Sequence, residues 1–95
     1  MAGYIIVDVE ITHPTEYEEY RKKVMPTLEA FGGKFLVRGG ASETLEGDWT
    51  SGRLVSLEFA SVARAKEWWG SESYRPAKRM RQAASRTRMI VVEGT

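Results

Sequence analysis

Apolar and β-branched residues alternate with polar residues in four stretches of the chain, and this two-residue period predicts four strands. The stretches are Tyr4–Thr12, Lys34–Arg38, Arg53–Phe59 and Arg88–Glu93. In the first and third of them one set of alternate positions is strongly apolar, which predicts a face that packs on a hydrophobic core. The other set in the first strand mixes apolar and acidic residues, so this second face is too apolar for ordinary solvent exposure.

A helical spacing of three and four residues follows the first strand. Pro14 suits the first turn, because its φ is already fixed and its missing N–H is not needed there. Pro26 removes a backbone donor and is expected to kink or interrupt the helix, and Gly32 offers a left-handed C-terminal cap. The expected buried stripe consists of Tyr17, Tyr20, Val24, Leu28 and Phe31.

Two shorter helices are predicted between the third and fourth strands. Ser61 is a good N-cap for a helix over Val62–Trp69. A last helix is expected to run to about Arg86, with either Ser71 or Ser73 as its cap. The chain therefore supplies a layer of helices as well as a sheet.

The connection between the second and third strands is rich in glycine. Gly39-Gly40 suits a bulge or bend, after which Glu43–Glu46 are expected to continue the strand pairing. Within the second strand, simple alternation puts Phe35 on the core side and Arg38 on the opposite side. The glycine pairs do not form a phosphate-binding loop, because such loops lie between a strand and a following helix.

The order strand, helix, strand, strand, helix, strand predicts an α+β, ferredoxin-like βαββαβ fold. In this fold a four-stranded antiparallel sheet carries its helices on one face, and its other face is bare. An apolar patch on a bare face usually marks an interface, so we expect a homodimer in which two sheets pair as a dimeric α/β barrel. The residues expected there are Tyr4, Ile6, Leu36, Leu54 and, depending on register, Met89 or Ile90.

Composition narrows the class of protein. The chain has 95 residues, which fit one domain spanning residues 1–95, with 42% hydrophobic and 28% charged residues. It has no cysteine, and the sequence shows no membrane span or signal peptide. The expected location is therefore the cytoplasm, with no membrane partner.

Charge is unevenly spread although its sum is only +1. The stretch Arg75–Arg88 is basic and contains no acid, which suggests either a nucleic-acid contact or a solvated helix face. RNA-binding domains of this topology display aromatic residues on their central strands. Here Phe35 and Phe59 are both expected on the helix-facing side. We therefore favour the solvated face and expect no nucleic-acid partner.

Several short motifs carry a family resemblance. They are Gly3-Tyr4-Ile5-Ile6-Val7, Tyr17-Glu18-Glu19-Tyr20, Gly32–Gly40, Leu45-Glu46-Gly47-Asp48-Trp49, Trp68-Trp69 and Val92-Glu93-Gly94. In this order they resemble the domain of unknown function 1330 family, within the dimeric α/β-barrel superfamily of ferredoxin-like folds. The resemblance implies a small, cytoplasmic, dimeric protein and brings no established reaction. Superfamily relatives include cofactor-free monooxygenases, haem-handling enzymes, isomerases and dehalogenases, an analogy of fold alone.

The residue types present exclude several chemistries. His13 is the only histidine, and no nucleophile motif surrounds it. A histidine-rich metal site is therefore excluded, and no metal or organic cofactor is expected. A mostly apolar cleft with a few polar groups is the most plausible kind of site.

The residues expected to bind substrate in such a cleft combine apolar bodies with polar tips or fixed positive charge: Tyr17, Tyr20, Arg38, Trp49 and Arg81. Glu46 and Glu58 are the candidate general bases, because burial raises a carboxyl pKa toward neutrality. Structural roles remain open for both sets. The aromatic residues also suit the core, and Arg38 with Glu46 or Glu58 also suits an ion pair that holds the sheet and the dimer.

Three functional hypotheses follow, of which the weakest is nucleic-acid contact through Arg75–Arg88. In the first, the protein binds or transforms a small, partly apolar carbonyl or carboxylate compound in a cleft between the helices and the sheet, without a metal or organic cofactor. In the alternative, it is a non-catalytic dimer that binds a ligand or a protein.

Overall fold

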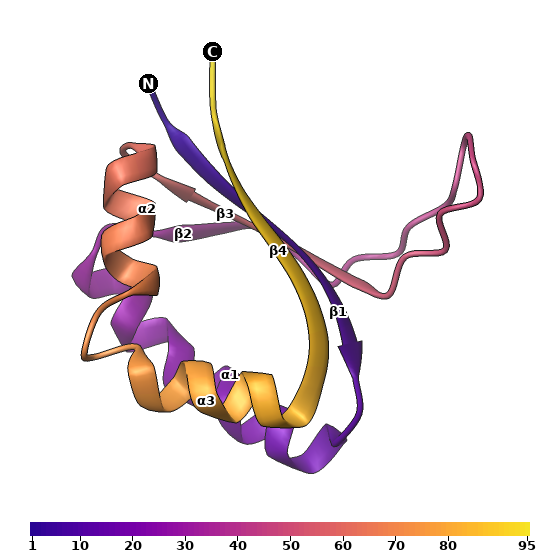
Figure 1. Ribbon diagram of the computed structural model, residues 1–95, viewed down its shortest axis with the longest axis horizontal. Coiled ribbons are helices and arrows are strands. Elements are labelled where there is room, and N and C mark those ends of the chain that lie inside the picture. Colours follow the sequence, from indigo (N-terminus) through magenta and orange to yellow (C-terminus); the bar gives the residue numbers. More distant parts are fainter.

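The computed structural model describes residues 1–95 and shows an antiparallel sheet with its helices on one face (Figure 1). The elements are β1 (Gly3–Ile11), α1 (Pro14–Ala30), β2 (Lys34–Arg38), β3 (Arg53–Phe59), α2 (Val62–Trp69), α3 (Arg75–Ala84) and β4 (Ser85–Glu93). The four strands lie in the order β2-β3-β1-β4. The predicted α+β, ferredoxin-like topology is confirmed. None of the helices combines the length and hydrophobicity needed to span a membrane.

The central strand β1 sets the two faces of the sheet. Its residue Ile5 pairs with Leu57 of β3 and Val91 of β4, and the alternation continues along both partners. Ile5, Val7 and Val9 are each at most 4% exposed, because they point toward the helices. The predicted core face is therefore confirmed.

Helix α1 begins at Pro14 as predicted, but it runs through Pro26 without interruption. The expected break is wrong because a proline removes only one backbone hydrogen bond, while buried residues on both sides of it, such as Val24 and Leu28, fasten the helix to the core. The C-terminal cap is as expected. Gly32 has a φ of 72°, and the N–H of Gly33 donates to the Leu28 carbonyl at 2.9 Å.

The two following helices differ from the prediction only at their ends. Neither Ser71 nor Ser73 caps α3, because its N-cap is Tyr74, which makes no side-chain capping hydrogen bond. Ser61 caps α2 by accepting a hydrogen bond from the backbone N–H of Arg64 at 3.0 Å. Helix α3 ends at Ala84 rather than Arg86, and β4 begins at Ser85 rather than Arg88. The cause is β1, whose last residue Ile11 pairs with Ser85, so β4 extends to match its length.

A β-bulge in β2 changes which side chains face the helices. Phe35 pairs with Leu57, but Val37 pairs with Ser56, so Leu36 is the extra residue. Because one inserted residue reverses the alternation, Arg38 faces the helices and Val37 faces away. The expectation that Arg38 lies on the opposite side from Phe35 is therefore wrong. The bulge lies at Leu36, and the glycine pair supplies the expected bend, at Gly39.

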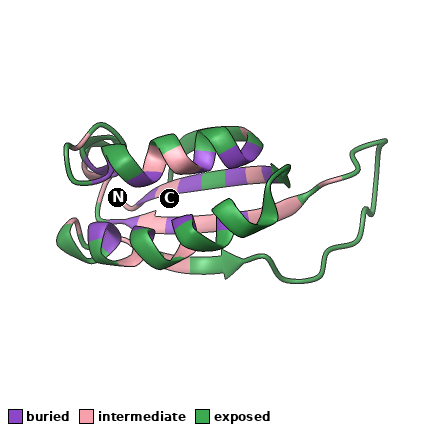
Figure 2. Cartoon of the chain, turned by 90° about the horizontal axis from the view of Figure 1, so that it is seen from below, coloured by how far each residue is buried: buried purple, intermediate pink, exposed green.

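Residues 40–52 form an arm that extends away from the body of the protein (Figure 1). Glu43–Glu46 do not continue the strand pairing, and residues 40–50 are all exposed (Figure 2). The arm is fastened at its root by Asp8. This carboxylate accepts hydrogen bonds from the indole N–H of Trp49 at 3.0 Å and from the backbone N–H of Gly52 at 2.9 Å.

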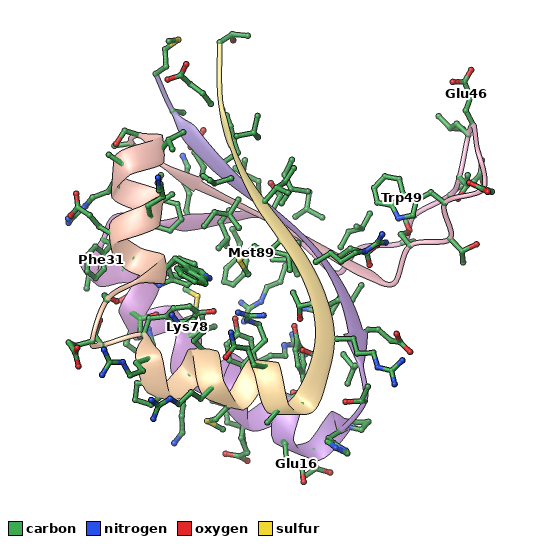
Figure 3. The ribbon with its side chains drawn as sticks, in the orientation of Figure 1. Glu16, Phe31, Glu46, Trp49, Lys78 and Met89 are labelled. Atoms are coloured by element: carbon green, nitrogen blue, oxygen red, sulfur yellow. The ribbon has the colours of Figure 1, made fainter.

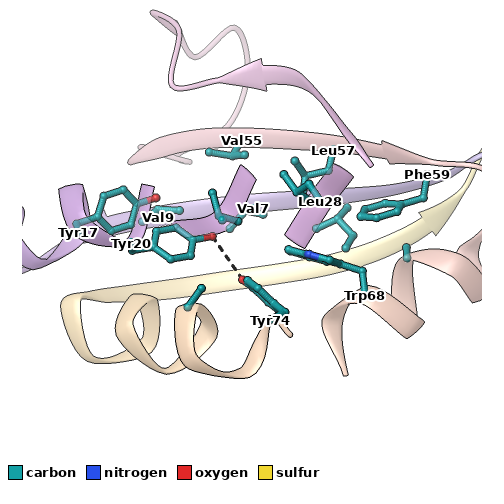
Figure 4. Packing of buried hydrophobic residues seen from close by; sticks show 14 of the residues in the cluster. Val7, Val9, Tyr17, Tyr20, Leu28, Val55, Leu57, Phe59, Trp68 and Tyr74 are labelled. Atoms are coloured by element: carbon teal, nitrogen blue, oxygen red, sulfur yellow. Dashed lines mark hydrogen bonds between the residues drawn. The ribbon is translucent and has the colours of Figure 1, made fainter. Parts of the chain in front are cut away.

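Aromatic side chains fill the core between the helices and the sheet (Figure 4). Trp68 of α2 is 1% exposed and stacks on Tyr74 with 4.0 Å between ring centroids. Its indole N–H donates to the Thr27 hydroxyl at 3.0 Å, and that hydroxyl donates to the Val24 carbonyl at 2.6 Å. This tryptophan therefore ties α2 to α1.

No helix covers the other face of the sheet, which we call the open face. Ile6 and Ile90 lie opposite each other on it, 40% and 61% exposed. Met89 instead packs against the core, so the register question is settled in favour of Ile90. Tyr4 and Leu54 lie on the same face, so the bare, partly apolar side predicted from the sequence is present.

Candidate functional site

A small pocket lies between the core face of the sheet and helices α1 and α3. Its volume is about 30 Å³, enough for roughly one water-sized group. Most of its lining is apolar, yet four arginines also line it and no carboxylate does. The lining residues are Val7, Val9, Tyr17, Tyr20, Arg21, Val24, Phe35, Arg38, Arg53, Val55, Leu57, Trp68, Arg81 and Met89.

Arg81 of α3 is the most deeply placed of these arginines. It is only 4% exposed, and its Nε–H donates to the hydroxyl of Tyr74 at 3.3 Å. It makes no ion pair, since none of the salt bridges in the protein includes it. A buried cation without a counter-ion is costly, so Arg81 is a candidate for binding an anion.

The other arginines are also short of partners. Arg21 pairs with Glu18 at 2.9 Å through one terminal nitrogen, but its Nε is buried without a hydrogen-bond partner. The Nε of Arg53 is likewise buried and unpaired. Arg38 has no acidic partner, and its guanidinium lies 4.2 Å from the ring centroid of Phe35. Unpaired buried donors are uncommon in folded proteins and call for an explanation.

Local backbone features put two of the arginines in place. The bulge at Leu36 turns Arg38 toward the pocket. Gly39 then leaves the strand with a φ of 71°, and a side chain at this position would collide with the guanidinium of Arg53. The left-handed turn therefore requires glycine, and the absence of a side chain also leaves room for the Arg53 guanidinium in its present position.

Two phenols supply neutral hydrogen-bonding groups near Arg81. The hydroxyls of Tyr20 and Tyr74 lie 3.4 Å apart (Figure 4). Burial, together with the neighbouring Tyr74, raises the pKa of Tyr20 well above its usual value. Tyr20 therefore stays protonated at neutral pH and serves as a hydrogen-bond donor, not as a base.

The structure brings together four of the seven residues that the sequence suggested. Tyr17, Tyr20, Arg38 and Arg81 all line the pocket. Arg21 was missed, although a signal existed: it follows Tyr17 by four positions, a spacing that places two residues on the same side of a helix.

Glu58 lies elsewhere, on the open face of the sheet. It forms an ion pair with Lys34 at 2.9 Å and sits opposite Tyr4. Hydrogen bonds from Lys34 and Tyr4 hold the pKa of Glu58 below its usual range. The carboxyl group is thus stabilised in its charged form, and its ion-pair partner is Lys34 instead of Arg38.

Glu46 and Trp49 lie on the arm and outside the pocket (Figure 3). Glu46 is at the tip of the arm, and Trp49 is nearer its root, where it is 54% exposed and bonded to Asp8. The expected continuation of strand pairing would have brought Glu46 to the sheet. Because residues 43–46 do not pair, Glu46 lies in solvent. Nowhere in the protein do three acidic or histidine side chains gather in a way that could hold a metal ion.

Solved structures share this fold. A protein of unknown function from Rhodopseudomonas palustris has a TM-score of 0.81 at 24% identity, over 99% of this chain and 82% of that one. A hypothetical protein from Arabidopsis thaliana gives 0.65 at 12% identity, over 98% and 88%. SnoaB, a cofactor-independent oxygenase from Streptomyces nogalater, gives 0.59 at 11% identity, over 99% and 93%.

At these identities the likeness establishes the fold only. No curated protein matches the chain. The family model described as Domain of unknown function (DUF1330), however, matches residues 2–95. The protein is therefore a member of the DUF1330 family.

Proposed function

We propose that this protein binds a small, partly apolar carbonyl or carboxylate compound in the arginine-lined pocket, without a metal or organic cofactor. One observation carries the proposal: four arginines and no carboxylate line a pocket that is otherwise mostly apolar. A guanidinium binds a carboxylate through two parallel hydrogen bonds. The apolar lining then suits the hydrocarbon part of the ligand.

The size of the pocket limits how a ligand enters. A volume of about 30 Å³ holds roughly one water-sized group, so a carboxylate enters only as lining side chains move. The rest of the ligand would extend toward Arg38, which is exposed. Because the arginines near the surface have long, flexible side chains, they are able to move aside for it.

Binding without catalysis is the form of the proposal that the residues favour. No carboxylate or histidine lines the pocket, and Tyr20 is held in its neutral form, so a general base is lacking. The catalytic alternative draws support from the fold shared with SnoaB, a cofactor-independent oxygenase. That support is an analogy of fold, because chemistry resides in the site and not in the fold.

We also propose that the protein is a homodimer joined through its open faces. Large apolar side chains are exposed there, including Ile6 and Ile90 at 40% and 61%. Exposed apolar patches commonly mark interfaces, and back-to-back pairing of two sheets would remove both patches from water.

Calorimetric titration with pentanoate and benzoate at low salt tests the binding proposal. We expect saturable binding that Arg81→Met weakens at least tenfold. Arg79→Met is the matched control, because Arg79 lies on the same helix but is exposed and outside the pocket. Absence of binding, or equal weakening by both variants, would refute the proposal. Incubation with the same acids in air, followed by mass spectrometry, should show no product if the protein is a binder only.

A further inference from the structure

We infer that the ligand of this pocket is a small dianion, with two carboxylates or equivalent acidic groups joined by a short apolar link. The inference rests on the proposed function and deepens it. It follows from the unpaired guanidinium groups, from the elements that carry them, and from the apolar residues that line the pocket with them.

The two arginines of the sheet lie close together. Arg38 of β2 pairs with Val55 of β3, and Arg53 lies two residues before Val55 on the same face. The two are therefore diagonal neighbours, whose side chains are close enough to interact. Two like charges in this arrangement repel each other, and no acidic side chain lines the pocket to offset them. An anion placed between them removes the repulsion and supplies an acceptor for the unpaired Nε–H of Arg53.

The helical wall of the pocket carries a cation of its own. Arg81 comes from α3, in the helical layer, and is buried with Tyr74 as its hydrogen-bond partner. Tyr20 adds a hydroxyl that stays protonated. This wall therefore has its own cation and its own neutral donors, separate from the pair on the sheet.

Both walls carry a cation that is shielded from water and has no counter-ion. Arg21 is paired with Glu18, and Arg38 is exposed and hydrated, which leaves Arg53 on the sheet and Arg81 on α3. A single carboxylate carries only one negative charge, so it cannot compensate cations on both walls. Two anionic groups, one for the sheet pair and one for Arg81, satisfy both walls.

The apolar residues that line the pocket beside the sheet arginines describe the middle of the ligand. Val7, Val55, Leu57 and Met89 lie on the core face of the sheet and line the same pocket. Figure 3 shows Met89 pointing into the space between the sheet and the helices. An apolar lining of this kind favours a short hydrocarbon link over a polar one.

The experiment compares glutarate, a five-carbon diacid, with pentanoate, the monoacid of the same chain length, by calorimetric titration at one fixed ionic strength. We expect glutarate to bind at least tenfold more tightly to the native protein. Arg53→Met and Arg38→Met should each reduce this preference to within about twofold, while pentanoate binding persists through Arg81. Arg79→Met, the exposed control, should keep the full preference.

Each outcome has a definite meaning. If pentanoate binds as tightly as glutarate, the dianion inference is overturned while the proposed function stands. If the preference survives in both sheet variants, general attraction to a basic protein explains it, and the inference is again overturned. If neither acid binds, the proposed function itself fails. Circular dichroism of each variant verifies that it is folded, and Arg38 is an exposed position whose replacement spares the core.

Discussion

Replacing Arg81 with methionine is expected to make the protein more stable while it weakens anion binding. The guanidinium is 4% exposed, it has no ion-pair partner, and its one hydrogen bond in the protein goes to Tyr74. A residue kept for the fold would lower stability when removed. A residue kept for a ligand is a source of strain when the ligand is absent.

The magnitude follows from three contributions. Burying an uncompensated charge costs several kcal/mol even after relaxation. A hydrogen bond from a charged donor returns about 1.5–3 kcal/mol, and a buried methionine contributes roughly 1.5–3 kcal/mol through apolar burial. In the variant the Tyr74 hydroxyl still has a hydrogen-bond partner, because the Tyr20 hydroxyl lies 3.4 Å away. Because the pocket is partly open to water, we expect a net gain near the low end, about 1–2 kcal/mol.

Urea and thermal unfolding of the ligand-free protein measure this gain. For a domain of this size, about 1 kcal/mol shifts the Tm by roughly 4–8 °C, so Arg81→Met should unfold at least about 4 °C above the native protein. The exposed control Arg79→Met should change stability by no more than about 0.5 kcal/mol. A loss of more than about 1 kcal/mol in Arg81→Met would show that the arginine supports the fold, and the argument for a binding role would collapse.

Three further predictions concern other parts of the molecule. Ile6→Asp should give monomeric or insoluble protein, because it places a charge on the proposed dimer face; an unchanged dimer in sedimentation would contradict that assignment. Hydrogen bonds, that from Trp49 foremost, hold the pKa of Asp8 below its usual range, so the contact between Asp8 and the arm is complete at neutral pH and is lost as the pH falls through that lowered pKa. The NMR resonance of the Trp49 indole N–H should therefore shift only in that acid range. In Asp8→Ala the resonance should already have the shifted position at pH 7. Thr27→Val leaves the buried indole N–H of Trp68 without its acceptor and should lower the free energy of unfolding by about 1–3 kcal/mol. An equal loss in a Trp68→Phe background would mean that the hydrogen bond is not the cause.

The fold was predictable because its signals are local and periodic. Alternating residues along β1 define the core face, Pro14 opens α1, and Ser61 caps α2, each through a preference that the sequence displays directly. The ends of α3 and β4 were misplaced because they depend on the length of β1, a partner far away in the chain. The interruption predicted at Pro26 was wrong for a related reason, because packing of the residues on both sides of it outweighs one lost hydrogen bond.

The pocket was predictable in its residue types and less so in its geometry. Tyr20 and Arg81 were identifiable as buried positions with polar tips on two amphipathic helices. The position of Arg38 was not, because the bulge at Leu36 leaves no composition signal and reverses the side to which Arg38 points. Glu58 was predicted as a candidate general base, but its environment depends on the cross-strand neighbours Lys34 and Tyr4, which the sequence alone does not identify.

The exposed arm is also a natural place to divide the protein into two fragments. A cut within residues 40–50 would leave β1, α1 and β2 on one fragment and all later elements on the other. In the sheet, β1 lies between β3 and β4, and β2 borders β3, so every strand contact in the sheet joins one fragment to the other. The two pieces would each lack a complete core, and their reassembly would restore it. This chain therefore has the layout required of a split reporter, in which association of two fused partners is detected through recovery of the folded domain.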